Sequence, residues 1–288
     1  MTSEYLSSAC PHDCPSTCAL EVERIDPYTI GRVRGAPDND YTLGVICDKV
    51  ARYRERIHHP SRLGYPLKRL GSKGSGRFAK ISWDEALDEV TEAFKSVASK
   101  YGAEAIWPYH YSGTMGLVQR DSMHRFRHTL GYSGLDETIC VRLAQTGWKA
   151  GIGVLWGTDA KDMVHSDLII IWGANPVSTQ VNVMTHVTRA RKQRGAKVIC
   201  IDPYRTQTAK SADIHLALRP GTDGALVCGI LHVLFKEGFA DREYMSRYTE
   251  SPDRLEKHLK NRSPAWAAKI TGIDEQKIVD FARLYGTN

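Results

Sequence analysis

The chain has 288 residues, of which 42% are hydrophobic and 25% charged, and its 39 Lys and Arg against 33 Asp and Glu give a net charge of +6. This composition indicates an ordinary globular protein of one large domain or two, and it excludes disorder, collagen and coiled coil over most of the length. The longest strongly apolar run, residues 168–174, is too short to span a bilayer, and the first residues have neither a basic leader nor a twin arginine. We therefore expect a cytoplasmic protein without a transmembrane segment.

Four of the seven cysteines lie near the start of the chain. Cys10, Cys14 and Cys18 are spaced C-x3-C-x3-C, and Cys47 follows after 28 intervening residues. Clustered thiols in a chain of this kind indicate metal binding more than disulfides. Three thiolates from one short loop and a fourth from a distant segment suit the iron corners of a 4Fe-4S cube. Structural zinc, which prefers two knuckles of two ligands each, and unligated thiols are the weaker alternatives.

The residues around these cysteines fit a loop that wraps a cluster. Pro11, Asp13 and Pro15 disfavour a helix between the ligands. Lys49 follows Cys47 by two residues, so its ammonium can stabilise the negative charge of a cluster and can lie on the path of electrons to a second centre. A solvated surface lysine is the alternative.

A basic stretch follows the cysteines. Residues 49–80 contain ten Lys and Arg and one acid, Glu55, whereas the rest of the chain has a small acidic excess. An anionic ligand or partner is therefore expected near this stretch. A phosphate-bearing cofactor or an acidic subunit is favoured over nucleic acid, because no helix-turn-helix, RNP or zinc-finger pattern accompanies the charge.

Strands and helices then alternate along the chain. A hairpin is predicted from residues 65–70 and 77–81 around a glycine-rich tip, and Ser82 with Glu85 forms a capping box that begins an amphipathic helix up to Gly102, whose apolar face we expect in the core. Further strands are predicted at 105–109, 138–141, 167–172, 197–202 and 215–218, and helices at 116–130, 144–151, 179–194, 223–237 and 275–284. The predicted fold class is α/β, with a small N-terminal β-rich domain followed by a doubly wound, mostly parallel sheet that has helices on both faces.

Ligands of such sheets bind at the carboxyl ends of the strands, so the residues just after each strand carry the functional information. Three of these segments, residues 173–176, 202–205 and 219–223, are rich in hydrogen-bonding groups. Asn175 can present an amide, Asp202 and Asp223 can accept from hydroxyls or a base, and arginines can meet phosphate. Together the three loops predict a nucleotide or dinucleotide site.

The chain resembles the molybdopterin oxidoreductases of the dimethyl sulfoxide reductase and formate dehydrogenase family. The resemblance covers nearly the whole length and rests on the cysteine module, Lys49 and residues 65–69, 81–86, 172–176, 202–203 and 219–226. It implies that Cys10, Cys14, Cys18 and Cys47 hold a 4Fe-4S cluster, that Lys49 lies between cluster and pterin, and that the strand-end loops bind molybdopterin guanine dinucleotide. The cofactor-binding set so implied is Lys49, Gly173, Asn175, Pro176, Asp202, Arg205, Pro220, Gly221, Thr222 and Asp223, with Asn175, Asp202 and Asp223 on the guanosine portion.

The resemblance also suggests a ligand to the catalytic metal. Members of the family use Ser, Cys or selenocysteine as a protein ligand to molybdenum or tungsten, and Cys140 looks like that position. A soft thiolate suits a metal already held by dithiolene sulfurs. A small buried hydrophobe is the alternative, and this is what we expect of Cys200 and Cys228.

The implied activity is that of an oxidoreductase of anaerobic metabolism that passes electrons between a molybdenum or tungsten bis-pterin site and the cluster. Its partners would be a small-molecule substrate and an Fe–S electron-transfer subunit or ferredoxin. A non-redox, hydratase-type member and a non-catalytic Fe–S module remain as alternatives. Formate dehydrogenases have a His directly after the metal ligand, where this chain has Val141, so formate is not expected as the substrate.

Catalytic subunits of the family are far longer than this chain. We therefore expect an N-terminal portion, inactive alone, that needs the remaining C-terminal part of the enzyme as its partner. Residues 1–64 would form the cluster domain and residues 65–288 the pterin-binding region.

Overall fold

The computed structural model describes residues 4–12, 14–109, 117–136 and 140–288, with the backbone alone for residues 117–121 and 140. The chain divides into two compact units, residues 1–157 and 158–288. Of the helices in the described residues, none is both long and apolar enough to cross a membrane.

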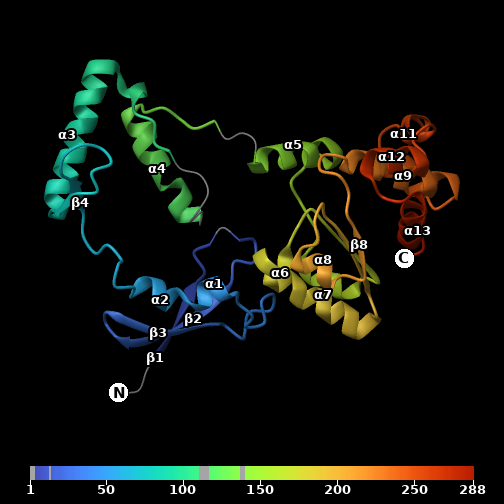
Figure 1. The fold of residues 1–288 in the computed structure, drawn as a ribbon, viewed down its shortest axis with the longest axis horizontal. Helices are drawn as coiled ribbons and strands as arrows, with labels where there is room; N and C mark the ends of the chain where they lie inside the picture. The colour runs from blue at the N-terminus through green and yellow to red at the C-terminus, as the bar shows by residue number, and fades with distance from the viewer. Residues whose placement is uncertain (1–3, 13, 110–116, 137–139) are drawn as a thin grey trace. The chain divides into compact units, whose positions relative to one another are not determined.

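The first unit begins with three strands (Figure 1). Its elements are β1 (Glu4–Ala9), β2 (Ala19–Asp26), β3 (Thr29–Gly35), α1 (Asp48–Ala51), α2 (Tyr53–Ile57), β4 (Leu67–Arg69), β5 (Phe78–Lys80), α3 (Trp83–Tyr101), the 3-10 helix η1 (Ala103–Ala105), α4 (Leu117–Leu130) and α5 (Cys140–Ile152).

The second unit alternates strands and helices before it ends in helices alone (Figure 1). Its elements are the 3-10 helix η2 (Ala160–His165), β6 (Leu168–Trp172), α6 (Pro176–Thr179), α7 (Val181–Arg194), β7 (Lys197–Ile201), α8 (Gln207–Ser211), β8 (Ile214–Leu216), α9 (Asp223–Lys236), α10 (Arg242–Tyr248), α11 (Pro252–Leu259), α12 (Pro264–Thr271) and α13 (Glu275–Gly286).

Strands β1, β2 and β3 form an antiparallel sheet in chain order, which confirms the small β-rich N-terminal region. A tight turn joins β2 to β3, and the Asp26 carboxylate accepts a hydrogen bond from the Tyr28 N–H at 2.8 Å within it. Leu20 and Val33 of the sheet bury their side chains against Val50 of α1. This small core holds α1 beside the sheet and so brings the segment around Cys47 to the cysteine loop.

The predicted hairpin and capping box are both present. Strands β4 and β5 pair antiparallel, the Ser82 hydroxyl accepts from the Glu85 N–H at 3.1 Å, and the Glu85 carboxylate accepts from the Ser82 N–H at 2.7 Å. The expectation that α3 packs into a core is wrong, because no residue of α3 is buried. Only the C-terminal half of its apolar face finds partners, where the ring of Phe94 packs against Phe126 and Tyr132.

One of the predicted strands is not formed, and another lies partly outside the described residues. Instead of a strand at 105–109, the chain makes the 3-10 turn η1, with Ile106 N–H donating to the Ala103 carbonyl at 3.1 Å, and residues 106–109 form no regular element. Pro108 has no N–H to give to a strand ladder. The strand predicted at 138–141 falls partly outside the described residues, and its last two residues, Cys140 and Val141, are helical and begin α5.

The second unit contains the predicted parallel sheet, in the order β6-β7-β8. Side chains on alternate positions of β6 enter different cores, as the period of two in a strand requires. Ile169 and Ile171 pack with Val187 and Ala190 of α7, whereas Ile170 and Trp172 pack toward α9, α12 and α13 on the other face. Helices therefore cover both faces of this sheet, which confirms the α/β class.

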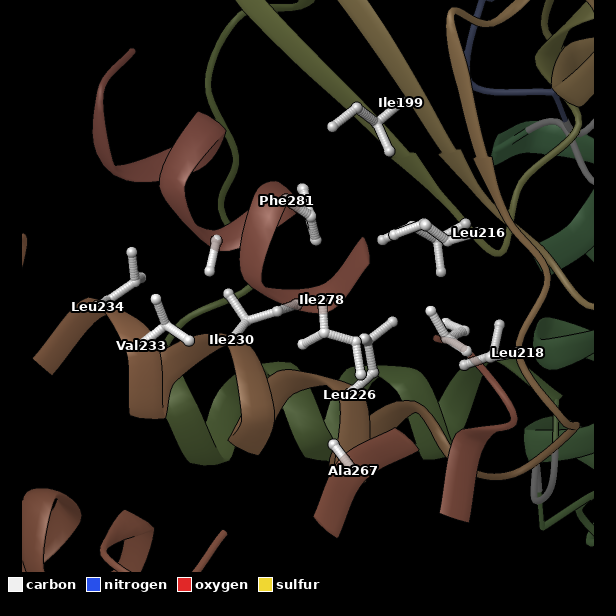
Figure 2. Packing of buried hydrophobic residues seen from close by; sticks show 13 residues of the cluster. Ile199, Leu216, Leu218, Leu226, Ile230, Val233, Leu234, Ala267, Ile278 and Phe281 are labelled. Atoms are coloured by element: carbon white, nitrogen blue, oxygen red, sulfur yellow. The ribbon is translucent and has the colours of Figure 1, made fainter. Parts of the chain in front are cut away.

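The larger core lies between the sheet and helices α9, α12 and α13 (Figure 2). Ile199 and Leu216 reach down from β7 and β8, and Leu226 of α9 lies beside Ile278 of α13 (Figure 2). Gly229 lets α9 and α12 approach closely, because a Cβ at this position would lie 2.7 Å from the Cβ of Ala267. The carboxyl edge of the sheet is thus fixed by packing from both sides.

Truncation of this core has a measurable expected effect. Leu226 is fully buried, so Leu226→Ala removes buried apolar surface and leaves a cavity, which lowers the free energy of unfolding by about 2–5 kcal/mol. The midpoint of denaturant unfolding measures this loss. Val227→Ala on the exposed side of the same helix is the control, with an expected change of about 0.5 kcal/mol or less. Equal effects of the two substitutions would contradict the packing.

Candidate functional site

The four N-terminal cysteines come together in the first unit. The Cys10 N–H donates to the Cys18 carbonyl at 2.9 Å, which closes the loop at the ends of β1 and β2. Cys18 is buried with Leu20, Val33 and Val50, and Cys10 and Cys47 pack against this cluster. Cys47 precedes the first residue of α1, and its carbonyl accepts from the Ala51 N–H at 3.1 Å.

Electrostatics tie Cys14 to the same group. Burial raises the pKa of the Cys10 thiol; a hydrogen bond from the His12 N–H works against this, and the charges of Cys47 and Cys14 raise the pKa further. Cys14 and Cys47 are therefore close enough to Cys10 to oppose the ionisation of its thiol. Coordination to iron cations relieves both the burial and the repulsion of the thiolates, so this donor set fits iron-bound thiolates better than free ones.

In the sequence, three of these cysteines lie in one loop and the fourth lies just before α1, which differs from the two knuckles of a structural zinc site. Within the described residues, no group of three or more His, Cys, Asp or Glu is arranged to hold a metal ion. A zinc site draws four ligands to about 2.3 Å from one ion, whereas a 4Fe-4S cube takes one thiolate at each iron and so keeps its ligands apart. The sequence spacing of the four cysteines fits the cube better than it fits zinc.

Polar side chains lie next to the cysteines, in the fold or in the sequence. The Tyr53 hydroxyl of α2 and the His12 Nε2 are 3.0 Å apart, which links α2 to the loop between Cys10 and Cys14. Lys49 lies in α1, two residues beyond Cys47, with an exposed side chain.

At the carboxyl end of the parallel sheet, the loop after β6 is joined to α8. The Asn175 Oδ1 accepts from the Thr208 hydroxyl at 2.7 Å and from the Thr208 N–H at 3.3 Å. A backbone N–H can only donate, so these bonds fix which end of the Asn175 amide faces Thr208. The NH2 end of Asn175 is left to donate elsewhere. Thr208 itself is fully buried and also accepts from the Val177 N–H at 3.2 Å.

Asp202 and Asp223 are also held in place by hydrogen bonds. The Asp223 Oδ1 accepts from the Trp172 indole N–H at 2.7 Å, which joins the first residue of α9 to the last residue of β6. Asp202 follows β7 and is buried; its Oδ1 accepts from the Tyr204 N–H at 3.1 Å, and its carbonyl contacts His215 Nε2 at 3.0 Å. Hydrogen bonds thus connect the loops after β6 and β7 to α8, β8 and α9.

The remaining predicted residues line the same edge. Gly173 and Gly221 adopt positive φ angles of 61° and 79°, which favour glycine in these turns. Pro176 is the buried first residue of α6, and Arg205 and Pro220 are exposed. The Thr222 hydroxyl donates to the Arg219 carbonyl at 2.6 Å. Arg219, one of the two arginines of these loops, donates to the carbonyls of Lys269 and Ile270 at the end of α12.

Cys140 is the first residue of α5, and its side chain lies outside the described residues. Cys200 is buried in β7, as expected of a core residue. Cys228 in α9 is only half-buried. The sequence analysis missed Thr208, the partner of Asn175, although Thr206 before α8 is a recognisable N-cap whose hydroxyl accepts from the Ala209 N–H.

Comparison with known proteins places these features in a family. Residues 4–59 match the molybdopterin oxidoreductase Fe4S4 domain, and residues 62–264 match the molybdopterin oxidoreductase model. The chain is 40% identical to the probable oxidoreductase YoaE of Bacillus subtilis over 97% of its own length and 41% of that protein. It is 33% identical to the putative dimethyl sulfoxide reductase chain YnfE of Escherichia coli over 97% of its length and 39% of that protein.

A solved structure agrees with these matches. Acetylene hydratase from Pelobacter acetylenicus superposes with a TM-score of 0.74 and 27% sequence identity, over 96% of this chain and 38% of that protein. The chain thus spans about two fifths of the length of the relatives that it matches. Because its residues match both of these family models, this chain belongs to the molybdopterin oxidoreductase family and contains the family's Fe4S4 domain.

Proposed function

We propose that the chain forms part of the catalytic subunit of a molybdenum- or tungsten-dependent oxidoreductase, in which electrons pass between a bis-pterin metal site and a 4Fe-4S cluster. The observation that carries this proposal is the gathering of Cys10, Cys18 and Cys47 around one small core, with Cys14 close to Cys10, in a member of this family. Residues 1–64 would form the cluster domain and residues 65–288 the region that binds the pterin nucleotide.

Each cofactor would be held by a set of residues described above. The four N-terminal cysteines would bind iron, and Lys49 would place a positive charge between cluster and pterin. Molybdopterin guanine dinucleotide would bind at the carboxyl edge of the parallel sheet, where Asn175 offers an amide donor and Asp202 and Asp223 offer acceptors. Gly173, Pro176, Arg205, Pro220, Gly221 and Thr222 would line the same site. The metal bound to the dithiolenes supplies the redox chemistry.

Cys140 is the proposed protein ligand to that metal. It begins α5, where the unpaired N–H groups of the first helical turn favour an anionic group. Thiolate is also the ligand type that suits a metal in a sulfur environment. The substrate would be a small molecule, and an Fe–S subunit or ferredoxin would exchange electrons with the cluster. Val141 after the ligand disfavours formate as this substrate.

A second candidate is a non-redox enzyme of the hydratase type, in which the metal only polarises water. The structural similarity to acetylene hydratase, at a TM-score of 0.74, favours its consideration. A third, a non-catalytic Fe–S module, keeps the cluster without a metal ligand at Cys140.

Metal analysis and a redox titration test these candidates. The oxidoreductase contains iron together with molybdenum or tungsten, and its metal changes oxidation state during turnover. A hydratase contains the same metals but turns over at constant oxidation state. A full cluster without molybdenum or tungsten would reject both enzymes. In the assembled enzyme, unchanged turnover and metal content after Cys140→Ala, which leaves no ligand atom at this position, would favour the module.

A further inference from the structure

The cysteine loop contains a buried hydroxyl that the proposed cluster ligands do not use. Residues 14–17 form a turn closed by a hydrogen bond from the Thr17 N–H to the Cys14 carbonyl at 3.1 Å, with Pro15 at its second position, which proline favours. Ser16 occupies the third position of this turn. It therefore lies between two of the proposed ligands, Cys14 and Cys18.

Burial alternates along this turn and places Ser16 on the inner side. Pro15 and Thr17 are exposed, whereas Ser16 and Cys18 are only 4% and 6% exposed. The side chain of Cys18 packs in the cluster that also includes Cys10 and Cys47. Ser16 thus faces the interior of the loop, on the same side as a proposed iron ligand.

The Ser16 hydroxyl has no hydrogen-bond partner among the described residues. A buried hydroxyl without a partner carries a free-energy cost, because it has given up its hydrogen bonds to water, so native proteins leave few of them. The hydroxyl has one proton to donate, and an acceptor in the interior of the cysteine loop would remove this cost.

We propose that the Ser16 hydroxyl donates a hydrogen bond to a sulfur atom of the 4Fe-4S cluster and thereby raises the cluster's reduction potential. This inference rests on the proposed function, because it needs the cluster at the four cysteines. The reduced cluster has one more negative charge than the oxidised cluster, so a donor to its sulfur stabilises the reduced form more. Ser16 is a positioning and tuning residue for electron transfer, not a ligand.

The test is a redox titration of the anaerobically purified enzyme with its cofactors, in which the cluster is followed by electron paramagnetic resonance. Ser16→Ala is expected to lower the midpoint potential by an amount that corresponds to a three- to tenfold fall in the equilibrium constant for reduction. For one electron, a tenfold change is about 59 mV. Ser16→Thr keeps a hydroxyl, so its midpoint potential is expected to remain close to that of the wild-type cluster.

Ser8→Ala, on the exposed face of β1, is the matched control and is expected to leave the potential unchanged. Ser16→Gly provides a second removal of the hydroxyl in case the alanine variant does not assemble. A cluster with the wild-type potential in a variant without the hydroxyl would overturn the role of Ser16. Absence of any 4Fe-4S signal from the wild-type enzyme would instead reject the proposed function, so the two failures are distinguishable.

Discussion

Replacement of Cys18 by alanine is expected to abolish the 4Fe-4S cluster. Cys18 is the most buried of the four N-terminal cysteines, and Cys10 and Cys47 pack against the small core that it helps to form. With one thiolate missing, one iron corner has no protein ligand, and a cube held by four cysteines becomes labile. Iron content of the purified protein is expected to fall from about four atoms per chain to nearly none, together with the visible absorbance of the cluster.

Cys228→Ala is the matched control for this experiment, because Cys228 is a half-buried free cysteine that lies in α9 of the second unit. Its iron content is expected to equal that of the wild type. Full iron and absorbance in Cys18→Ala would contradict the cluster assignment. Wild-type protein that contains zinc in place of iron would contradict it as well.

The sequence alone predicts the parallel sheet well, for a physical reason. Residues 168–172 and 197–201 are almost wholly apolar because both faces of β6 and β7 are covered by helices. A wholly apolar run of about five residues is too short for a buried helix and therefore predicts a buried strand. The helices that follow these strands have clear boundaries. The strand-end loops were identifiable for the same reason, since the topology of a parallel sheet brings the ends of its strands to one edge.

Features that depend on tertiary partners were harder to predict. The spacing of Trp83, Leu87 and Val90 predicts an apolar helix face, but the spacing does not say what covers it, and these side chains are 65%, 59% and 49% exposed. β-branched Thr138, Ile139 and Val141 favour a strand locally, yet Val141 is helical.

Three further helices were missed although their ends carry recognisable signals. Asp241 caps α10 and Ser263 caps α12, each with its side chain accepting from a backbone N–H, and Pro264 follows Ser263 as the first residue of α12. Pro252 is likewise the first residue of α11. These helices are short, so the apolar period has few turns in which to appear.

The structure shows which side chains of the proposed nucleotide site can donate a hydrogen bond to a ligand and which can accept one. An asparagine side chain can donate or accept, and the sequence does not decide which. Because Thr208 donates to the Asn175 Oδ1 from both its hydroxyl and its N–H, the group left for a ligand is the NH2 donor. Asp202 and Asp223 present only acceptors when ionised. The site therefore matches a ligand that has an acceptor for Asn175 and N–H or O–H donors for the aspartates, as a guanine nucleotide has.

Loss of the Asn175 amide is accordingly expected to weaken retention of the pterin nucleotide by about ten- to a hundredfold, because the ligand's acceptor is then left buried and unpaired, which costs about 1–3 kcal/mol. Asn175→Leu removes the donor and keeps the size of the side chain. Thr208→Val is nearly isosteric but removes the hydroxyl that orients the amide, so a smaller loss, about threefold to tenfold, is expected. Pterin released from purified protein and quantified by fluorescence measures both effects.

Thr188→Val, on the exposed side of α7, is the control. If Thr208→Val retained the full pterin content while Asn175→Leu lost it, the amide would not depend on Thr208 for its orientation; if both retained it, the nucleotide would not bind at this edge of the sheet.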